Sequence, residues 1–291
     1  MNNRIGDLLK TILSGPEQDY AESQIRRVFG GDDPDYEGET LDEWCSDGVG
    51  CMLCITPRSG STYLSQLLES TGRIGIAQEF MNLWNYEKNI SDILGALTQI
   101  APRDEPVFED GLTSLSSYVR NAVRISQSGE GVFAMKGDLY QFMPLFTRGW
   151  VHAGMQKIRF VYVTREDVLM QAISLFRAIR SGEWSSDHVR LQEVSFDRDG
   201  ILDQFDYLLQ MMRRWEMLFS LLGIHPLRVT YEQISKDPRG AVRRIASHIG
   251  LRGAVEIGEA QLKRQRDEQS ELWAAMLHAE TASLLRNSVA Q

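Results

Sequence analysis

Residues suited to metal binding and redox chemistry are few in this chain of 291 residues. It has three cysteines, Cys45, Cys51 and Cys54, and five histidines without metal-ligand spacing. Cys51 and Cys54 form a Cys-x-x-Cys pattern on a presumed strand, where this spacing points the two side chains to opposite faces. We therefore expect no bound metal, and we interpret the cysteines as small core residues rather than a redox pair.

Long apolar runs and an excess of positive charge are also lacking. No run approaches the roughly 20 apolar residues that a membrane-spanning helix needs, and the first residues lack a signal-peptide core. The chain has 31 basic and 40 acidic residues, a net charge of −9, which argues against broad nucleic-acid binding. We expect a soluble, cytoplasmic protein in which a local basic cluster holds any anionic ligand.

The chain divides into two parts of different character. Residues 1–47 combine short amphipathic helices with an acidic stretch, and form an N-terminal arm that could contact a second subunit, act as a lid or be only partly ordered. From residue 48 to residue 291, helices alternate with short apolar strands. This pattern is typical of one α/β domain with a mainly parallel central sheet flanked by helices. Strands are expected at 51–55, 73–77, 132–135, 158–163 and 227–230. Helices beyond the first one are expected at 91–100, 113–128, 166–181, 201–222, 238–250 and 267–285.

The most informative stretch follows the first predicted strand. Residues 57–62, Pro-Arg-Ser-Gly-Ser-Thr, make a small polar turn before leucines at helical spacing. Backbone N–H groups of such a loop and of the first helical turn converge on an anion, which the helix dipole also favours. Glycine allows close backbone approach, arginine supplies charge and the hydroxyls supply donors. The ligand groups predicted here are Arg58, Ser59, Gly60, Ser61 and Thr62.

This loop differs from a Walker A loop, Gly-x-x-x-x-Gly-Lys-Ser/Thr, because it has one glycine and no lysine. A sulfuryl group carries less charge than a terminal phosphoryl group. Arginine, hydroxyl and backbone donors can then replace a bridging Mg²⁺ during transfer. The loop resembles that of sulfotransferases, which bind the 5′-phosphosulfate of 3′-phosphoadenosine-5′-phosphosulfate (PAPS). A turn without any ligand is the alternative.

A second anion site is predicted at the end of the strand at 158–163. Arg165 follows this strand, and Ser174 lies nine residues later in the next helix. Ligands gather at the carboxyl ends of strands in open α/β sheets, so Arg165 and the loop would share one rim. The resemblance to sulfotransferases implies that Arg165 and Ser174 hold the 3′-phosphate of the cofactor. The alternative is a helix-start arginine with a surface serine.

Several ordered blocks between about residues 49 and 275 resemble the bacterial trehalose 2-sulfotransferase family. The blocks are 57–68, 76–80 (Ile-Ala-Gln-Glu-Phe), 160–178, 228–232 (Arg-Val-Thr-Tyr-Glu), 264–267 (Arg-Gln-Arg-Asp) and 270–273 (Ser-Glu-Leu-Trp). The resemblance implies a PAPS-dependent transferase with a hydroxyl acceptor, typically on a carbohydrate, and a homodimer. The arm at 1–47 departs from the family, and residues 80–120 show no pattern specific for a disaccharide. Sugars, glycolipids and other alcohols therefore stay open as acceptors.

Sulfuryl transfer needs a base for the acceptor's proton, and Glu79 is the candidate. It follows the loop helix by one short predicted strand, and the resemblance implies a general-base glutamate in the same Gln-Glu-Phe context. Serine or tyrosine would be a poorer base at neutral pH. A solvated glutamate is the alternative interpretation.

The resemblance also implies that Tyr231 approaches the adenine. Arg264 and Arg266 could close over the 3′-phosphate. The alternatives are that Tyr231 is a core residue and that residues 263–266 form a solvated basic face of a helix. The roles of Lys136, Asp138 and Trp184 stay open. Lys136 could neutralise the transferring group, and Trp184 could stack on adenine, line the acceptor pocket or pack in the core.

Two rival functions remain. One is a kinase of the P-loop class for a small alcohol, with Asp138 or Asp167 on Mg²⁺, which the missing Walker lysine disfavours. The other is a nucleotide-binding regulatory module without turnover. Dependence on ATP and Mg²⁺ would distinguish the first, and unchanged ligand binding in a Glu79→Gln variant without any transfer would distinguish the second.

Overall fold

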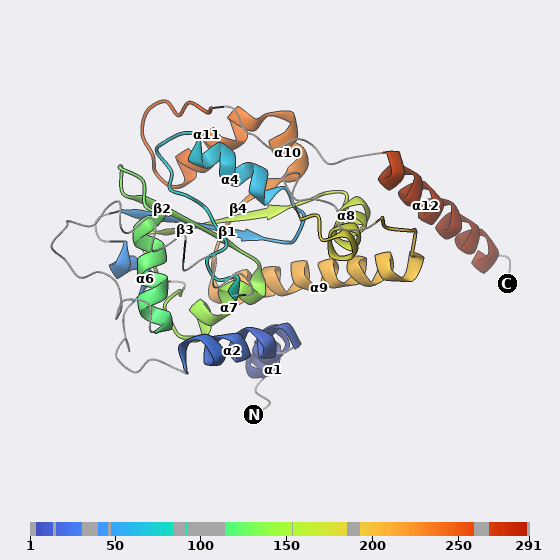
Figure 1. Ribbon diagram of the computed structural model, residues 1–291, viewed down its shortest axis with the longest axis horizontal. Coiled ribbons are helices and arrows are strands. Elements are labelled where there is room, and N and C mark those ends of the chain that lie inside the picture. The colour runs from blue at the N-terminus through green and yellow to red at the C-terminus, as the bar shows by residue number, and fades with distance from the viewer. Residues whose placement is uncertain are drawn as a thin grey trace.

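A computed structural model of the chain describes residues 4–13, 16–30, 40–45, 48–83, 91, 114–152, 154–184, 193–258 and 268–289. In these residues four parallel strands form one sheet in the order β2-β1-β3-β4. The strands are β1 (Val49–Ile55), β2 (Val132–Gly137), β3 (Ile158–Thr164) and β4 (Leu227–Thr230). Figure 1 shows helices on both faces of this sheet, which confirms the predicted fold class.

The short strand expected at 73–77 is not formed. Here the chain meets β2 at separate points: the Gly75 N–H donates to the Val132 carbonyl at 3.1 Å, and the Lys136 N–H donates to the Gln78 carbonyl at 3.0 Å. Gln78 makes an isolated bridge with Met135. The segment therefore crosses the edge of β2 without building a ladder, and it ends beside the carboxyl end of that strand.

The predicted helices are confirmed within a few residues where the structure describes them, except that most of 91–100 lies outside the described residues. The additional helices α3, α7 and α10 were not expected, and α7 contains Pro144, a residue that argues against a helix interior. The helices are α1 (Arg4–Leu13), α2 (Pro16–Phe29), α3 (Leu41–Trp44), α4 (Ser61–Glu69), α6 (Leu115–Ile125), α7 (Leu139–Thr147), α8 (Val168–Ser181), α9 (Arg198–Leu222), α10 (Tyr231–Lys236), α11 (Pro238–His248) and α12 (Glu268–Val289).

The sheet separates two cores because side chains alternate along each strand. Cys51 and Leu53 of β1 pack with leucines of α4 and apolar residues of α11, whereas Met52 and Cys54 pack with residues of α6, α7 and α9. The predicted opposite orientation of Cys51 and Cys54 is confirmed. All three cysteines are free and buried, and burial raises the pKa of the Cys51 thiol to about 12. The thiols are therefore core residues.

The N-terminal helices belong to the second of these cores. Ile12 of α1 and Ile25 of α2 are each 1% exposed and join the cluster that α7 and α9 build. Arg148, which follows α7, forms two hydrogen bonds with the carboxylate of Glu22, at 3.1 and 3.0 Å. The described part of residues 1–47 thus contacts the rest of the chain. The domain boundary at residue 48 and a lid or intersubunit role of this arm stay predictions.

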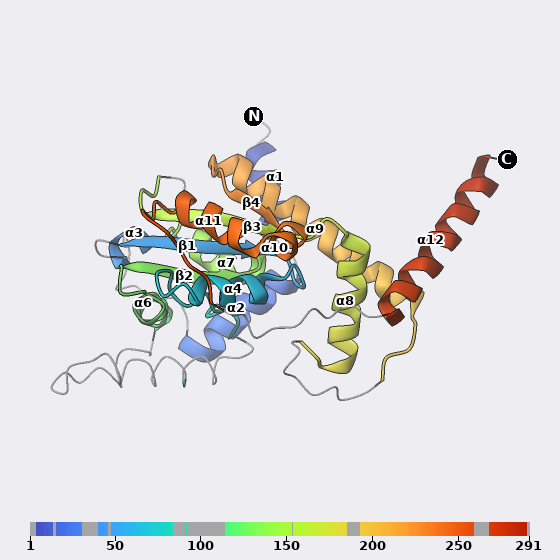
Figure 2. The same ribbon diagram turned by 90° about the horizontal axis from the view of Figure 1, so that it is seen from above.

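Helix α12 extends away from the sheet, as Figures 1 and 2 show. Its first half packs against α8, where the rings of Trp273 and Phe176 lie 6.3 Å apart in an edge-on arrangement. Its second half is exposed, and Leu284 and Leu285 are each 62% accessible. The far part of α12 therefore presents apolar side chains to solvent.

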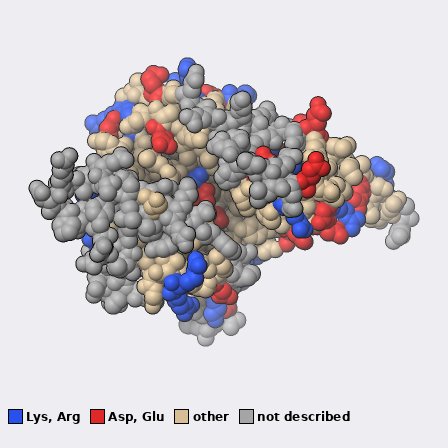
Figure 3. Space-filling view, in the orientation of Figure 1, with Lys and Arg blue, Asp and Glu red and all other residues tan. Residues whose placement is uncertain are grey.

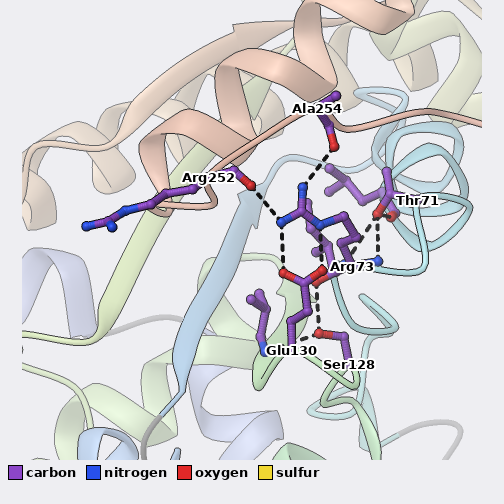
Figure 4. A network of polar contacts seen from close by, with 9 residues as sticks. Thr71, Arg73, Ser128, Glu130, Arg252 and Ala254 are labelled. Atoms are coloured by element: carbon purple, nitrogen blue, oxygen red, sulfur yellow. Dashed lines mark hydrogen bonds and ion pairs between the residues drawn. The ribbon is translucent and has the colours of Figure 1, made fainter.

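A polar network joins the segment after α11 to Arg73, which follows α4, and to Glu130, which precedes β2 (Figure 4). The Arg73 guanidinium binds the Glu130 carboxylate through two bonds of 2.6 and 2.8 Å and donates to the Arg252 and Ala254 carbonyls at 2.8 and 2.9 Å. The hydrogen bonds from Arg73 lower the pKa of Glu130. Residues 251–258 are thereby fastened beside the end of α4.

Both acidic and basic side chains lie on the surface that Figure 3 displays, as the 31 basic and 40 acidic residues of the chain lead one to expect. Figure 3 shows acidic and basic side chains side by side on the face that it displays, including the end formed by α12. There Arg198 binds Asp199 and Glu280 at 2.8 and 2.9 Å. None of the described helices has the length and apolar character that crossing a membrane requires.

Candidate active site

The candidate site lies at the carboxyl ends of the strands, where the loop at residues 56–60 joins β1 to α4. Helices from elsewhere in the chain hold this loop. The Trp215 indole N–H of α9 donates to the Ile55 carbonyl at 3.0 Å. The Gln171 amide of α8 donates to the Thr56 hydroxyl at 2.8 Å and to the Pro57 carbonyl at 2.6 Å. These contacts from α8 and α9 hold the backbone at residues 55–57, where the chain passes from β1 into the loop.

The loop backbone adopts left-handed conformations at two positions. Gly60 has φ = 78°, and Arg58, with φ = 62°, is the one non-glycine residue with positive φ among those described. A Cβ atom at position 60 would lie 2.5 Å from the ring of Tyr231, so glycine is needed for both conformation and space. No side chain caps the start of α4. The backbone N–H groups of its first turn are therefore suited to an anion, as the sequence predicts.

The donors of the loop fit an anionic group. Ser59 is fully buried, and its hydroxyl oxygen has no hydrogen-bond partner among the described residues. Buried polar groups are normally satisfied, so such a hydroxyl marks a place where a ligand oxygen would be favourable. The Ser61 side chain is 6% exposed and begins α4 beside it. The loop and the first turn of α4 thus offer small polar side chains and backbone N–H groups to a ligand.

The β3 side of the loop brings Arg58 of the loop close to Arg165 and Ser174, which are predicted for a second anion site. Arg58 Nε donates to Ser174 Oγ at 3.0 Å, and another nitrogen of its guanidinium donates to the Trp184 carbonyl. The Arg165 guanidinium lies over the Tyr231 ring, 4.9 Å from its centroid. Burial chiefly, and then the charge of Arg165, lower the pKa of Arg58, while Glu183 acts in the opposite direction. The two arginines are thus close enough to repel each other.

The β2 side of the loop holds Glu79. The Lys136 ammonium lies 3.4 Å from Glu79 Oε1 and donates to the Thr62 hydroxyl at 3.1 Å. Gln141 and Asn82 donate to Glu79 Oε2 at 3.3 and 3.4 Å. The Glu79 side chain is 32% exposed, whereas that of Lys136 is 7% exposed. This arrangement leaves a carboxylate accessible at the start of α4 and holds it on both oxygens.

The two aspartates considered as Mg²⁺ ligands each begin a helix. Asp138 accepts the Gln141 backbone N–H at 2.9 Å at the start of α7. Asp167 accepts the Met170 backbone N–H at 3.0 Å at the start of α8. N-terminal capping of this kind is the usual structural role of an aspartate at these positions. The geometry explains both residues without a metal role.

Some functional contacts were not predicted from the sequence. Gln171 lies three residues before Ser174, so helical spacing on α8 could have indicated that both face the loop. Gln141 lies on α7, which was not predicted, and Asn82 follows Glu79 in a segment without a pattern. The Trp184 side chain is 48% exposed, and the part of the chain that carries Arg264 and Arg266 lies outside the described residues.

Comparison with known proteins identifies the family. The sequence profile of the Stf0 sulphotransferase family matches residues 50–280. This chain belongs to the Stf0 sulphotransferase family, and it is a sulfotransferase. It is 24% identical over 270 residues, covering 80% of this chain and 96% of the relative, to the trehalose 2-sulfotransferase of Mycobacterium tuberculosis (strain ATCC 35801 / TMC 107 / Erdman). Among solved structures it is similar to the sulfotransferase domain of the Synechococcus PCC 7002 olefin synthase, with a TM-score of 0.45, 14% identity and coverage of 76% of this chain and 77% of that chain.

Proposed function

We propose that this sulfotransferase moves a sulfuryl group from PAPS to a hydroxyl of a carbohydrate, a glycolipid or another alcohol, by in-line transfer without a metal. The observation that carries the proposal is the loop at 56–60 with arginines on one side and Glu79 on the other. A metal-free transfer requires such protein donors around the transferring group.

The proposed binding roles follow the position of each side chain around the loop. Backbone N–H groups at the start of α4 and the hydroxyls of residues 59, 61 and 62 would hold the 5′-phosphosulfate. Arg165 and Ser174 would hold the 3′-phosphate, and Tyr231 would approach the adenine. Arg58, predicted with the loop, would lie between the two phosphate sites, because it contacts Ser174. Arg264 is proposed to close over the 3′-phosphate. PAPS itself supplies the activated sulfuryl group and a phosphate leaving group.

Glu79 is proposed as the general base. Its carboxylate accepts the acceptor's proton while the acceptor oxygen bonds to sulfur, and the bond from sulfur to the phosphate oxygen breaks with its electron pair left on 3′,5′-adenosine bisphosphate (PAP). Gln141 and Asn82 donate to Oε2, so they fix the orientation of the carboxylate. The side chain is partly exposed, which allows an acceptor hydroxyl to reach it.

A carbohydrate acceptor is supported by the relative from Mycobacterium tuberculosis, whose name specifies trehalose. The match covers 96% of that relative, so the similarity extends over nearly its whole length. Residues 80–120, where we expect the acceptor wall, lie largely outside the described residues. We therefore propose the acceptor class and leave the choice of sugar, glycolipid or other alcohol to experiment.

We also propose a homodimer. The exposed Leu284 and Leu285 on the projecting half of α12 support it, because apolar side chains grouped on a surface often mark a protein contact. Light scattering at micromolar concentration should give twice the chain mass of 33.1 kDa. A mass of one chain would overturn this part of the proposal.

The proposed function is tested by a transfer assay with ³⁵S-labelled PAPS in the presence of EDTA. The acceptor panel should include trehalose, other sugars, glycolipids and simple alcohols. We expect label in at least one acceptor, with one PAP released for each labelled product. Transfer that requires Mg²⁺ and uses ATP, with none from PAPS, would show that the enzyme is a kinase and overturn the proposal.

A further inference from the structure

Arg58 has an uncommon backbone conformation that other parts of the site must hold. Among the residues that the structure describes, it is the one non-glycine residue with positive φ, 62°. Such a conformation is strained, and it persists only where surrounding contacts hold it. Burial also lowers the pKa of its guanidinium, so the charged group has lost part of its hydration and needs acceptors from the protein. The contacts of this side chain therefore decide whether Arg58 is ready for an anionic ligand.

Two of these contacts come from helix α8 and the turn that follows it. Arg58 Nε donates to Ser174 Oγ at 3.0 Å, and Nη1 donates to the backbone carbonyl of Trp184. Ser174 lies inside α8, whereas Trp184 lies three residues beyond the end of this helix. Ser174 is also proposed to bind the cofactor, but the Trp184 carbonyl has no role so far. Because a carbonyl is a neutral acceptor, it orients the guanidinium without cancelling the charge that an anion needs.

The turn that presents this carbonyl is itself held by a buried serine. Ser181, the last residue of α8, is 3% exposed. Its hydroxyl donates to the Arg177 carbonyl at 2.8 Å and accepts the backbone N–H of Glu183 at 3.1 Å. Between them Gly182 has φ = 73°, the left-handed conformation that ends the helix. The serine hydroxyl thus fixes the direction in which the chain leaves α8, directly before the carbonyl at residue 184.

We propose that Ser181 is a positioning residue for the cofactor site: it holds the turn at 181–184, whose last carbonyl keeps Arg58 oriented for the anionic groups of PAPS. The inference rests on the proposed function. Ser181 does not touch the ligand and acts only through Arg58. A guanidinium that is already oriented loses less conformational freedom on binding, so the benefit appears as affinity. Both PAPS and PAP should gain from it, since Arg58 would lie between two phosphate sites that both ligands occupy.

The test is a double-mutant cycle read by calorimetric titration of PAP in EDTA. Ser181→Ala removes the hydroxyl that holds the turn, and Arg58→Ala removes the group through which it would act. In the wild-type background, Ser181→Ala should weaken PAP binding about three- to tenfold, the net effect of one hydrogen bond. In the Arg58→Ala background the same change should alter PAP affinity by less than about twofold. In the transfer assay, Ser181→Ala should raise KM for PAPS and leave kcat within about a factor of two of wild type.

Ser126→Ala is the matched control, because Ser126 follows α6, is 1% exposed and donates to the Val123 carbonyl at 3.1 Å. It should lower Tm as Ser181→Ala does but keep normal PAP affinity. Equal losses from Ser181→Ala in both backgrounds, no loss in either, or a gain in affinity would overturn the positioning role and leave the proposed function standing. Failure of the wild-type enzyme to bind PAP would instead overturn the proposed function itself. If Ser181→Ala does not fold, the same cycle is measured with Ser181→Cys, whose thiol is a weaker hydrogen-bonding group.

Discussion

The two sides of the loop at residues 56–60 carry charge in different ways. On the β3 side two arginines lie close together, and the charge of Arg165 contributes to a lowered pKa of Arg58. On the β2 side the cation Lys136 lies 3.4 Å from the carboxylate of Glu79. One side thus places like charges together, and the other pairs opposite charges.

This difference separates binding from chemistry in the proposed function. Two neighbouring cations repel each other, and an anion placed between them relieves that repulsion, so the β3 side is suited to hold a phosphate. The ion pair of the β2 side offers an ionised carboxylate that can accept a proton. Variants on the two sides should therefore change different measured quantities.

The largest effect should come from Glu79→Gln, which keeps size and polarity but cannot accept the acceptor's proton. General-base catalysis typically contributes about 10²- to 10⁴-fold, so kcat should fall by that factor in the PAPS transfer assay. Glu69→Gln, at the exposed end of helix α4 and away from the segment that carries Glu79, is the control and should keep normal turnover. Near-normal turnover in Glu79→Gln would remove Glu79 from the mechanism.

Gly60→Ala should destabilise the loop that separates the two sides. The left-handed backbone and the 2.5 Å approach to Tyr231 should together lower the free energy of unfolding by about 1–3 kcal/mol and weaken PAP binding. Gly72→Ala is a matched control, because Gly72 has φ = 64° and open space around its Cβ position. It should cost only about 1 kcal/mol and leave PAP affinity unchanged. Equal effects of both variants in urea unfolding and PAP titration would contradict the packing of Tyr231 against the loop.

A smaller effect should come from the Arg73–Glu130 pair, which lies outside both sides of the site. Its hydrogen bonds lower the pKa of Glu130 in the folded protein, so the pair stabilises the fold above the ordinary glutamate pKa of about 4.3. That contribution is lost as the pH falls through the lowered pKa. The difference in Tm between wild type and Glu130→Gln should thus be constant from about pH 6 to 8 and shrink below about pH 4. A difference that grows on acidification would contradict the assignment.

The β3 side could be predicted from the sequence to a large extent. The apolar run at 51–55 and the turn at 57–62 specify a strand, a loop and a helix through local pattern alone. Arg165 follows a second apolar run, and parallel strands bring their carboxyl ends to one rim. The proximity of Arg58, Arg165, Ser174 and Tyr231 follows from that topology.

The β2 side could be predicted only in part, because its contacts depend on where the segment that carries Glu79 meets β2. Glu79 reaches Lys136 since Gln78 bridges to Met135, and no local pattern indicates where a chain crosses the edge of a strand. Gln141 lies on a helix whose internal Pro144 obscures the helical pattern.

The division of roles between the two sides is tested most directly by calorimetric titration of PAP, in EDTA, into wild type, Arg58→Ala, Arg165→Ala and Glu79→Gln. Loss of a charge-assisted phosphate contact costs about 1.5–3 kcal/mol, so each arginine variant should bind PAP roughly tenfold or more weakly. Glu79→Gln should bind within about a factor of three of wild type, because its carboxylate is proposed to face the acceptor. Normal binding in both arginine variants, or a large change in Glu79→Gln alone, would contradict the account.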